Sequence, residues 1–318
     1  MPAVQVLAVE EGFGRRPGFG FGAVGAGWVQ SRRPANGLAQ KAGIDSASKA
    51  RTRRIPEFYY TGQIMLKTAI AVVLLTFTGL GFTASAQVQL KKDEWPPVAT
   101  FSILGYDPAT GEVGGAVQSR VFSVGNGVLW AEAGAGVAAT QAIVDVSYGP
   151  QAIQLLKLGY APAKVLSFVH DADADPDPVR WTKFGRQFAV MNAKGEYAAY
   201  TGPKATEWAG NKGGKFCTAQ GNILAGEGVV NGMVEAFEKT TGHLSMRLLA
   251  ALEAGQKAGG DKRGMQSAAM LIVKKDGGVW LHNDVVLRLQ VDDNPEPIKE
   301  LRRLVESAGK RFRLGEQK

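Results

Sequence analysis

A short polar turn, Asp261–Ser267, carries the densest set of groups that could do chemistry in this sequence. It places the carboxylate of Asp261, the guanidinium of Arg263 and the hydroxyl of Ser267 directly before an apolar segment. An acid, a cation and a hydroxyl in one turn can orient or polarise a substrate, and loops at strand ends commonly form binding sites. A capped turn without function has the same residues, and the sequence leaves both interpretations open.

Other patterns that suggest ligands lack an essential part. Four carboxylates alternate along Asp171–Asp177, but this run has neither the central glycine nor the closing glutamate of a calcium loop, so we interpret it as a solvated loop. The glycines of Gly125–Gly127 and Gly134–Gly136 precede no Gly-Lys-Ser/Thr and predict turns. Three scattered histidines and a single cysteine, Cys217, predict no metal site. We expect no cofactor.

The polar turn lies within alternating groups of strands and helices. The strands that we predict are Ala99–Tyr106, Glu112–Ser119, Val128–Glu132, Gly136–Ala142, Gln187–Asn192, Glu196–Thr201, Phe216–Gly221, Ser267–Lys274 and Val285–Val291. The helices that we predict are Gly149–Gly159, Ala161–His170, Val229–Thr240, Leu244–Ala258 and a last helix that follows Asp292–Pro295. The glycines and alanines of the two strands that flank Gly134 indicate that neighbouring backbones approach closely.

This order predicts an α+β fold. Consecutive hairpins favour antiparallel sheets, and grouped helix pairs argue against a Rossmann alternation. Two mostly antiparallel sheets between two helix layers would bury all of these elements. We expect residues 99–310 to form this single domain.

The segment that precedes the domain has the three parts of a secretory signal. In residues 65–86, Lys67 provides the positive charge, Ala69–Phe82 the apolar stretch and Ala84–Ala86 the small-residue cleavage site. We therefore predict a periplasmic or secreted protein, with residues 87–98 as a linker. Residues 1–64 are rich in glycine and arginine. We interpret them as an N-terminal extension that either was assigned to the protein by mistake or is disordered.

The positive charge of the chain is concentrated in this leader. The net charge is +8, but residues 87–318 carry 27 basic and 25 acidic side chains, which leaves them nearly neutral. A nearly neutral domain gives no reason to expect nucleic acid or, apart from the signal, a membrane as a partner. A small molecule or peptide is the expected partner, and a homodimer stays open.

Several segments resemble the signature of one family, the domain of unknown function 1028 (DUF1028), which is placed in the N-terminal-nucleophile (Ntn) hydrolase superfamily. The matching segments are Thr100–Ile103, Asp107–Gly111, Ala139–Gln141, Arg186–Gln187, Gln220–Leu224, Ala258–Ala269 and Leu287–Asp293. The resemblance covers nearly the whole domain and implies the four-layer αββα sandwich, in agreement with the order of the elements.

The resemblance also implies a role for Thr100. An Ntn nucleophile uses its own α-amine as general base, so Thr100 would have to become the N-terminus by cleavage after Ala99. Two features depart from the peptidases of the superfamily: Gln118 stands in place of an aspartate, and residues 128–130 offer no lysine. These departures argue against proteasome-like peptidase activity.

Three interpretations follow for the function. The first is an exported Ntn-type hydrolase of an amide bond in a small molecule or peptide. The second is a non-catalytic ligand-binding module of the same fold, and the third is an enzyme that uses Ser119, Arg120 and Asp261 instead. As catalytic residues we predict Thr100, Ser119 and Asp261. As substrate-binding residues, gathered with them at one end of the sandwich, we predict Arg120, Gln141, Asn222, Arg263 and Ser267.

Overall fold

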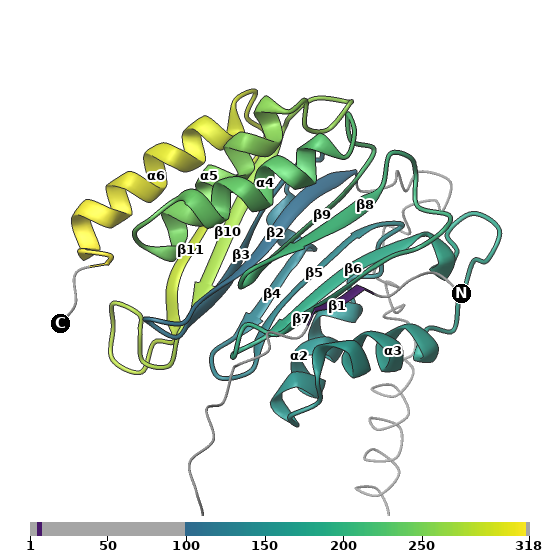
Figure 1. Ribbon diagram of the computed structural model, residues 1–318, viewed down its shortest axis with the longest axis horizontal. Helices are drawn as coiled ribbons and strands as arrows, with labels where there is room; N and C mark the ends of the chain where they lie inside the picture. Colours follow the sequence, from purple (N-terminus) through teal and green to yellow (C-terminus); the bar gives the residue numbers. More distant parts are fainter. Residues whose placement is uncertain (1–4, 8–98, 316–318) are drawn as a thin grey trace, which may run out of the picture. The chain divides into compact units, whose positions relative to one another are not determined.

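Two antiparallel sheets form the centre of the computed structural model, which describes residues 5–7 and 99–315 (Figure 1). One sheet has the strand order β11 (Val285–Val291), β10 (Ser267–Val273), β3 (Glu112–Ser119), β2 (Thr100–Asp107), β9 (Cys217–Asn222) and β8 (Gly210–Gly214). The other has the order β1 (Gln5–Leu7), β7 (Tyr197–Thr201), β6 (Arg186–Asn192), β5 (Gly136–Ala142) and β4 (Leu129–Glu132). Every neighbouring pair is antiparallel.

Helices cover the outer face of each sheet (Figure 1). The six-stranded sheet is covered by α4 (Gly228–Lys239), α5 (Leu244–Lys257) and α6 (Pro297–Phe312). The five-stranded sheet is covered by α2 (Tyr148–Lys157) and α3 (Pro162–Ala172), and two short 3₁₀ turns, η2 (Val124–Asn126) and η3 (Lys183–Gly185), lie in loops. Over the residues described, this arrangement confirms the predicted α+β sandwich.

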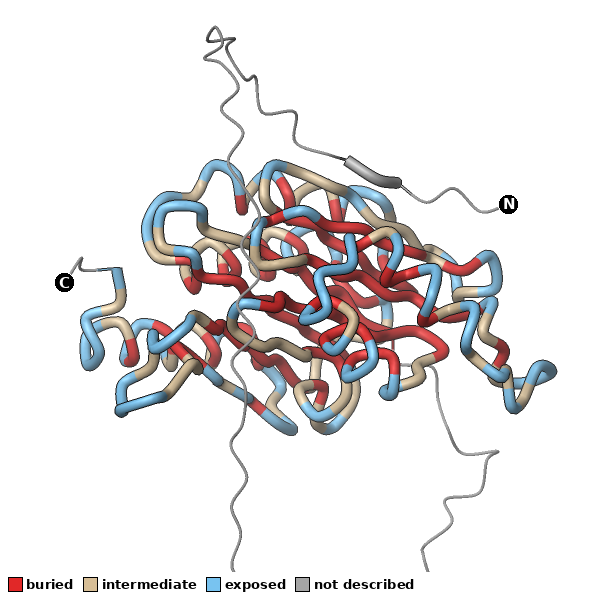
Figure 2. The backbone as a smooth tube through the Cα atoms, turned by 90° about the horizontal axis from the view of Figure 1, so that it is seen from below, coloured by how far each residue is buried: buried red, intermediate tan, exposed pale blue. Residues whose placement is uncertain are grey.

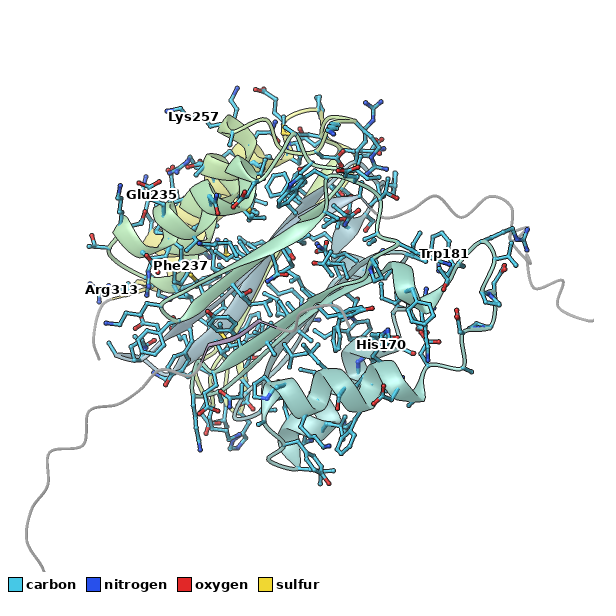
Figure 3. All side chains as sticks on the ribbon, turned by 45° about the vertical axis from the view of Figure 1, so that its right-hand side comes forward. His170, Trp181, Glu235, Phe237, Lys257 and Arg313 are labelled. Carbon is cyan, nitrogen blue, oxygen red and sulfur yellow. The ribbon has the colours of Figure 1, made fainter. Side chains whose placement is uncertain are left out.

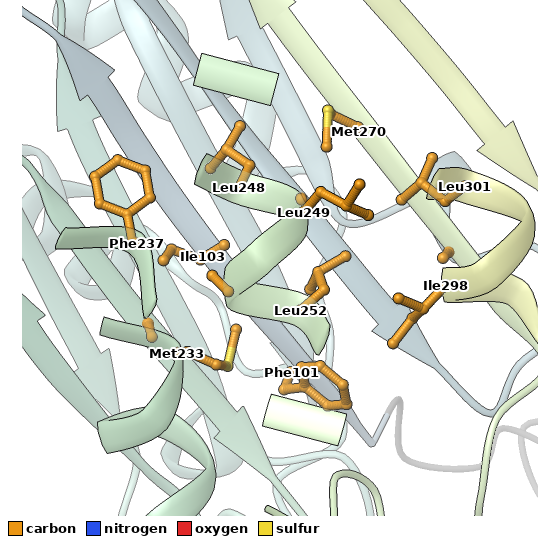
Figure 4. Close-up of a cluster of buried hydrophobic side chains, with 14 of the residues drawn as sticks. Phe101, Ile103, Met233, Phe237, Leu248, Leu249, Leu252, Met270, Ile298 and Leu301 are labelled. Atoms are coloured by element: carbon orange, nitrogen blue, oxygen red, sulfur yellow. The ribbon is translucent and has the colours of Figure 1, made fainter. Parts of the chain in front are cut away.

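Three apolar clusters hold the four layers together. The middle cluster lies between the sheets and includes Leu104, Val117 and Val137. The cluster beneath α4, α5 and α6 is shown in Figure 4, and a third lies beneath α2 and α3. In Figure 2 the buried residues follow the strands through the centre of the molecule. Alternate residues of β2 therefore face different clusters, as the two-residue period of a strand requires.

The spacing of leucines in α5 is confirmed. Leu244, Leu248 and Leu252 are completely buried in the cluster beneath the helices. Residues four positions apart share one face of a helix, so this spacing aims all three side chains at the sheet. Truncation of one such leucine to alanine costs about 2–5 kcal/mol.

Glycines allow the close approach that the small-residue strands predict. Gly136 has a φ of +145°, and a Cβ there would lie 2.1 Å from the carbonyl oxygen of Met191 on β6. A Cβ on Gly149, at the start of α2, would lie 2.1 Å from the Trp130 ring of β4. No side chain fits in either position.

Three details differ from the predictions or lie beyond them. Strands β1 and β8 were not predicted, and β1 lies within residues 1–64, which we interpreted as an extension assigned by mistake or disordered. Helix α2 ends at Lys157, two residues before its predicted end. The signal-like segment 65–86 and the linker 87–98 lie outside the described residues. Among the residues that are described, no helix has the length and apolar character needed to cross a membrane.

Candidate functional site

Four polar side chains lie side by side at one end of the six-stranded sheet. Thr100, the first residue of β2, is directly opposite Ser119 on β3 and Asn222 on β9, and Ser119 is opposite Ser267 on β10. Directly opposed residues of antiparallel strands point to the same face. This face is the one that meets the second sheet, and all four residues are completely buried.

The hydroxyl of Thr100 begins a short chain of hydrogen bonds. Thr100 Oγ1 donates to Ser119 Oγ at 3.1 Å, and Ser119 Oγ donates in turn to the carbonyl oxygen of Ala99. The same carbonyl oxygen accepts a hydrogen bond from Nη2 of Arg263 at 2.9 Å. A hydroxyl and a guanidinium thus contact the carbonyl of the peptide bond that joins Ala99 to Thr100. Such donors stabilise negative charge on a carbonyl oxygen.

Asp261 holds Arg263 in this position. Its Oδ1 accepts from the backbone nitrogen and Nε of Arg263 at 2.9 and 3.2 Å, and its Oδ2 accepts from Nη2 at 2.9 Å. Oδ2 also accepts from the backbone nitrogen of Arg120 at 3.3 Å. The Asp261 carboxylate is completely buried, whereas the Arg263 side chain is 29% exposed. Bidentate pairing fixes the plane of the guanidinium, which lysine could not reproduce.

The backbone of the polar turn explains why these groups meet. Lys262 donates to the carbonyl of Ile223, and Gln266 donates to the carbonyl of Ser119, at 3.0 and 3.1 Å. Gly264, with a φ of +105°, reverses the chain between them. The turn is therefore attached both to the segment after β9 and to the end of β3, so that Asp261 and Arg263 lie beside the start of β2.

Gln141 reaches the site from the opposite sheet through buried amides. Its Oε1 accepts from Ser102 Oγ at 2.7 Å, and its Nε2 donates to Gln187 Oε1, also at 2.7 Å. Gln187 Oε1 accepts from Asn222 Nδ2 at 3.1 Å as well, and Gln220 Nε2 donates to Ser102 Oγ at 2.6 Å. The side chains of Ser102, Gln187 and Gln220 were not among the predicted site residues.

One acceptor at the site has no hydrogen-bond partner among the residues that the structure describes. Oδ1 of Asn222 is buried and accepts no hydrogen bond within the described residues. Burial of a polar atom without a partner costs free energy. Since Asn222 lies directly opposite Thr100, this oxygen is available to a donor that arrives at the start of β2.

Two predicted site residues have their side chains engaged elsewhere. Ser267 Oγ donates to the carbonyl of Val121 at 2.7 Å and accepts from the backbone nitrogen of Val124 at 3.0 Å. The guanidinium of Arg120, an exposed residue, donates to the carbonyl of Arg263. Both residues lie close to the site and stabilise the loops that form it, but neither of these contacts reaches Thr100.

The acidic run 171–177 is not a fully solvated loop, and that interpretation is wrong for Asp173. Its side chain is 1% exposed and pairs with Nε of Arg186 at 3.1 Å. Tyr148 donates a hydrogen bond to it at 2.6 Å. Burial acts to raise the pKa of Asp173, but hydrogen bonds from Tyr148 and Asp175 and the charge of Arg186 hold the pKa below its ordinary value. Within residues 5–7 and 99–315, no three acidic, histidine or cysteine side chains are placed to hold a metal.

Comparisons with known proteins agree with the resemblance. The model of a family of unknown function, DUF1028, matches residues 100–301. A DUF1028 protein from Silicibacter pomeroyi, solved by crystallography, is 33% identical with a TM-score of 0.59, over 66% of this chain and 86% of its own. The ancestral β-subunit Anbu from Yersinia bercovieri shares 9% identity with a TM-score of 0.31, over 69% of this chain and 99% of its own, which is too distant to bear on the fold. No curated protein matches. The chain therefore belongs to the DUF1028 family.

Proposed function

We propose that the chain is an exported Ntn-type hydrolase that cleaves an amide bond in a small molecule or peptide, with Thr100 as its nucleophile. One observation carries the proposal: the carbonyl oxygen of Ala99 accepts hydrogen bonds from Arg263 and Ser119, and Ser119 also accepts one from the Thr100 hydroxyl. These contacts favour cleavage of the Ala99–Thr100 bond, because they polarise its carbonyl group beside a hydroxyl. Cleavage would free the α-amine that an Ntn nucleophile uses as its base.

In the processing step, Oγ1 of Thr100 attacks the carbonyl carbon of Ala99. Arg263 and Ser119 stabilise the negative charge that develops on the carbonyl oxygen. The departing nitrogen of Thr100 takes the proton of Oγ1 as the C–N bond breaks, while Ser119 keeps its own proton on the carbonyl oxygen. Water then hydrolyses the resulting ester, which gives the carboxylate of Ala99, the free hydroxyl of Thr100 and its free amine. No other reactant is needed.

The same groups then serve the substrate. The freed α-amine, whose reference pKa is about 7.7–8.0, takes the proton of Oγ1 near neutral pH. The substrate carbonyl oxygen occupies the place that the Ala99 oxygen has left, between Ser119 and Arg263. The acyl group is transferred to Oγ1, the leaving amine takes the proton, and water releases the acid. Oδ1 of Asn222 accepts a hydrogen bond from the Thr100 amine.

Burial supports processing before catalysis. Ala99, Thr100 and Ser119 are all completely buried, so a substrate cannot reach the hydroxyl while Ala99 occupies the site. Loss of Ala99 would open the end of β2 to solvent. The exported state of the protein is supported by the signal-like pattern of residues 65–86.

The intact mass and the N-terminal residue of the purified protein test the proposal. We expect wild-type protein to begin at Thr100. We expect the Thr100→Ala variant to retain Ala99, because no hydroxyl is left to attack its carbonyl. The matched control is Thr241→Ala, at an exposed threonine, which should be processed normally.

A non-catalytic binding module is the second candidate. It is favoured by the amide network of Gln141, Gln187 and Asn222, whose hydrogen bonds resemble those of a fixed structural core. Folded wild-type protein that still carries Ala99 would contradict the hydrolase and favour this module. Its ligand would then bind without any change of covalent structure.

A further inference from the structure

A polar cavity lies at the opposite end of the six-stranded sheet from Thr100. It has a volume of about 650 Å³ and is lined by the start of β3, the N-terminus of α5, the loop after β10 and the C-terminal end of α6. Glu112, which lines it, pairs in the sheet with Asp107, the last residue of β2. Asp107 follows Thr100 by seven residues along β2. At about 3.3 Å per residue, the cavity is therefore roughly 23 Å from Thr100. It is thus separate from the candidate active site.

A buried carboxylate lines this cavity, and one of its oxygens accepts no hydrogen bond among the residues described. Glu112 is 7% exposed, and its Oε1 lies 3.2 Å from Nε2 of His243. Nδ1 of His243 accepts from the backbone nitrogen of Ser245 at 3.2 Å, which places the ring proton on Nε2, where it is donated to Glu112. Oε2 lies 3.1 Å from the same nitrogen but accepts no hydrogen bond within the described residues. A buried carboxylate oxygen without a hydrogen bond favours a ligand that supplies a hydrogen-bond donor.

The rim of the cavity carries the opposite charge. Lys274, at the end of β10, and Arg311, in the last turn of α6, line it, and neither forms an ion pair within residues 99–315. Arg313, which also lines the cavity, lies at the C-terminal end of α6 (Figure 3). Asp276 faces the same space, and Lys275 lies 3.7 Å from its carboxylate. Lys274 and Arg311, which form no ion pair among the residues described, favour an anionic group at the rim.

Apolar side chains complete the lining. Val286, Phe312 and Leu314 contribute apolar surface to the cavity wall. A cavity of this volume lies in the range that binds small ligands, which are held by a mostly apolar wall and a few placed polar groups.

We infer that this cavity is a binding site for a zwitterionic ligand, an amino acid or a short peptide with an apolar side chain. The ligand ammonium donates to Oε2 of Glu112, and the ligand carboxylate pairs with Lys274 and Arg311. The apolar side chain packs against Phe312 and Leu314. The site is independent of the proposed hydrolase activity, because it uses none of the residues around Thr100.

The test is calorimetric titration of the full chain with the dipeptide Gly-Leu and two derivatives. N-acetyl-Gly-Leu lacks the ammonium, and Gly-Leu amide lacks the carboxylate. We expect Gly-Leu to bind at least about tenfold more tightly than either derivative, because each derivative loses one charged contact. The titrations are repeated with the Thr100→Ala variant, which prevents turnover and should bind Gly-Leu equally well.

Two variants assign the binding to the cavity. Glu112→Gln should weaken Gly-Leu binding about tenfold and abolish the preference for a free amine. Lys274→Ala leaves the Glu112–His243 contact intact and should abolish the preference for a free carboxylate. Glu132→Gln, at a carboxylate that is 41% exposed on β4, is the matched control and should not change binding. Melting temperatures of the ligand-free variants show that each one is folded.

Three results would overturn the inference. The first is no detectable binding of Gly-Leu at millimolar concentrations. The second is equal binding of Gly-Leu and its two derivatives. The third is binding that survives both Glu112→Gln and Lys274→Ala but is lost in Thr100→Ala, which would place the dipeptide at the candidate active site instead.

Discussion

Arg263 donates a hydrogen bond to the carbonyl oxygen of Ala99 at 2.9 Å, across 164 residues of sequence. Asp261, which is bound to the same guanidinium, keeps this donor in place. Inside a sheet a backbone carbonyl normally accepts from a backbone N–H of the next strand. A hydrogen bond from a charged donor makes this carbonyl carbon more electrophilic. The hydroxyls of Thr100 and Ser119 lie beside it.

The first prediction concerns the donors to the Ala99 oxygen. Arg263→Ala and Ser119→Ala should each slow cleavage after Ala99, because removal of one donor to a developing oxyanion costs about 10²–10³ in rate. The fraction of uncleaved chain, followed by intact mass after synthesis, measures the effect. Arg303→Ala, at a 65% exposed arginine on α6, is the control. Cleavage at the wild-type rate in Arg263→Ala would show that this hydrogen bond has no part in processing.

The sequence predicted the site residues that lie at strand ends, but not the buried glutamines within the strands. Thr100, Ser119 and Asn222 could be grouped because each was expected at or near the end of a strand. Gln187 and Gln220 were not predicted to belong to the site, since an amide in an apolar strand shows its partner only when the register of the sheets is known. That register brings Gln187 within hydrogen-bond distance of Asn222 and Gln141.

The fold was predictable wherever one face of an element is apolar. The leucines of α5 and the apolar residues of β10 made those elements evident. Strand β8 has the sequence Gly-Asn-Lys-Gly-Gly and shows no alternation of apolar residues. This segment is a strand because it pairs with β9. Its own sequence gives no indication of a strand. Likewise, the burial of Asp173 depends on Arg186, which no local pattern connects to it.

The second prediction concerns this buried ion pair. Asp173→Asn should lower the free energy of unfolding by about 3–5 kcal/mol, because it leaves the guanidinium of Arg186, which is 2% exposed, without its counter-charge. Denaturant titration measures the change. The control Asp171→Asn, at an exposed position of the same run, should stay within about 0.5 kcal/mol of wild type. Equal effects of the two variants would contradict the role of the pair.

The third prediction follows from the lowered pKa of Asp173. In the unfolded chain this carboxyl has its ordinary pKa of 3.8, and in the folded protein the pKa is lower. The stability that Asp173 contributes is therefore fully present above pH 3.8 and is lost as the pH falls towards the folded pKa. The difference in unfolding free energy between wild type and Asp173→Asn should shrink as the pH is lowered below that value. A difference that grows with acidity would refute this sign.

The fourth prediction concerns the thiol of Cys217. Burial, aided by the charge of Glu238, raises its pKa from 9.0 to about 12. The thiol should therefore stay protonated and unreactive towards Ellman's reagent at pH 8 in the folded protein, and react at once in guanidinium chloride. The contribution of the protonated thiol to stability is complete below pH 9.0 and is lost as the pH rises towards 12. Rapid reaction of the native protein would show that the residue is accessible.

The last prediction compares two glycines in the β4–β5 hairpin that share a positive φ. Gly134 has a φ of +79° and open space around a built Cβ, whereas Gly136 has a φ of +145° and a Cβ position 2.1 Å from the carbonyl oxygen of Met191. Gly134→Ala should cost about 1–2 kcal/mol, from backbone strain alone. Gly136→Ala should cost about 3 kcal/mol or more, because backbone of β6 must move. Thermal unfolding of the two variants checks the order, and similar costs would mean that the strands β5 and β6 can separate without loss of packing.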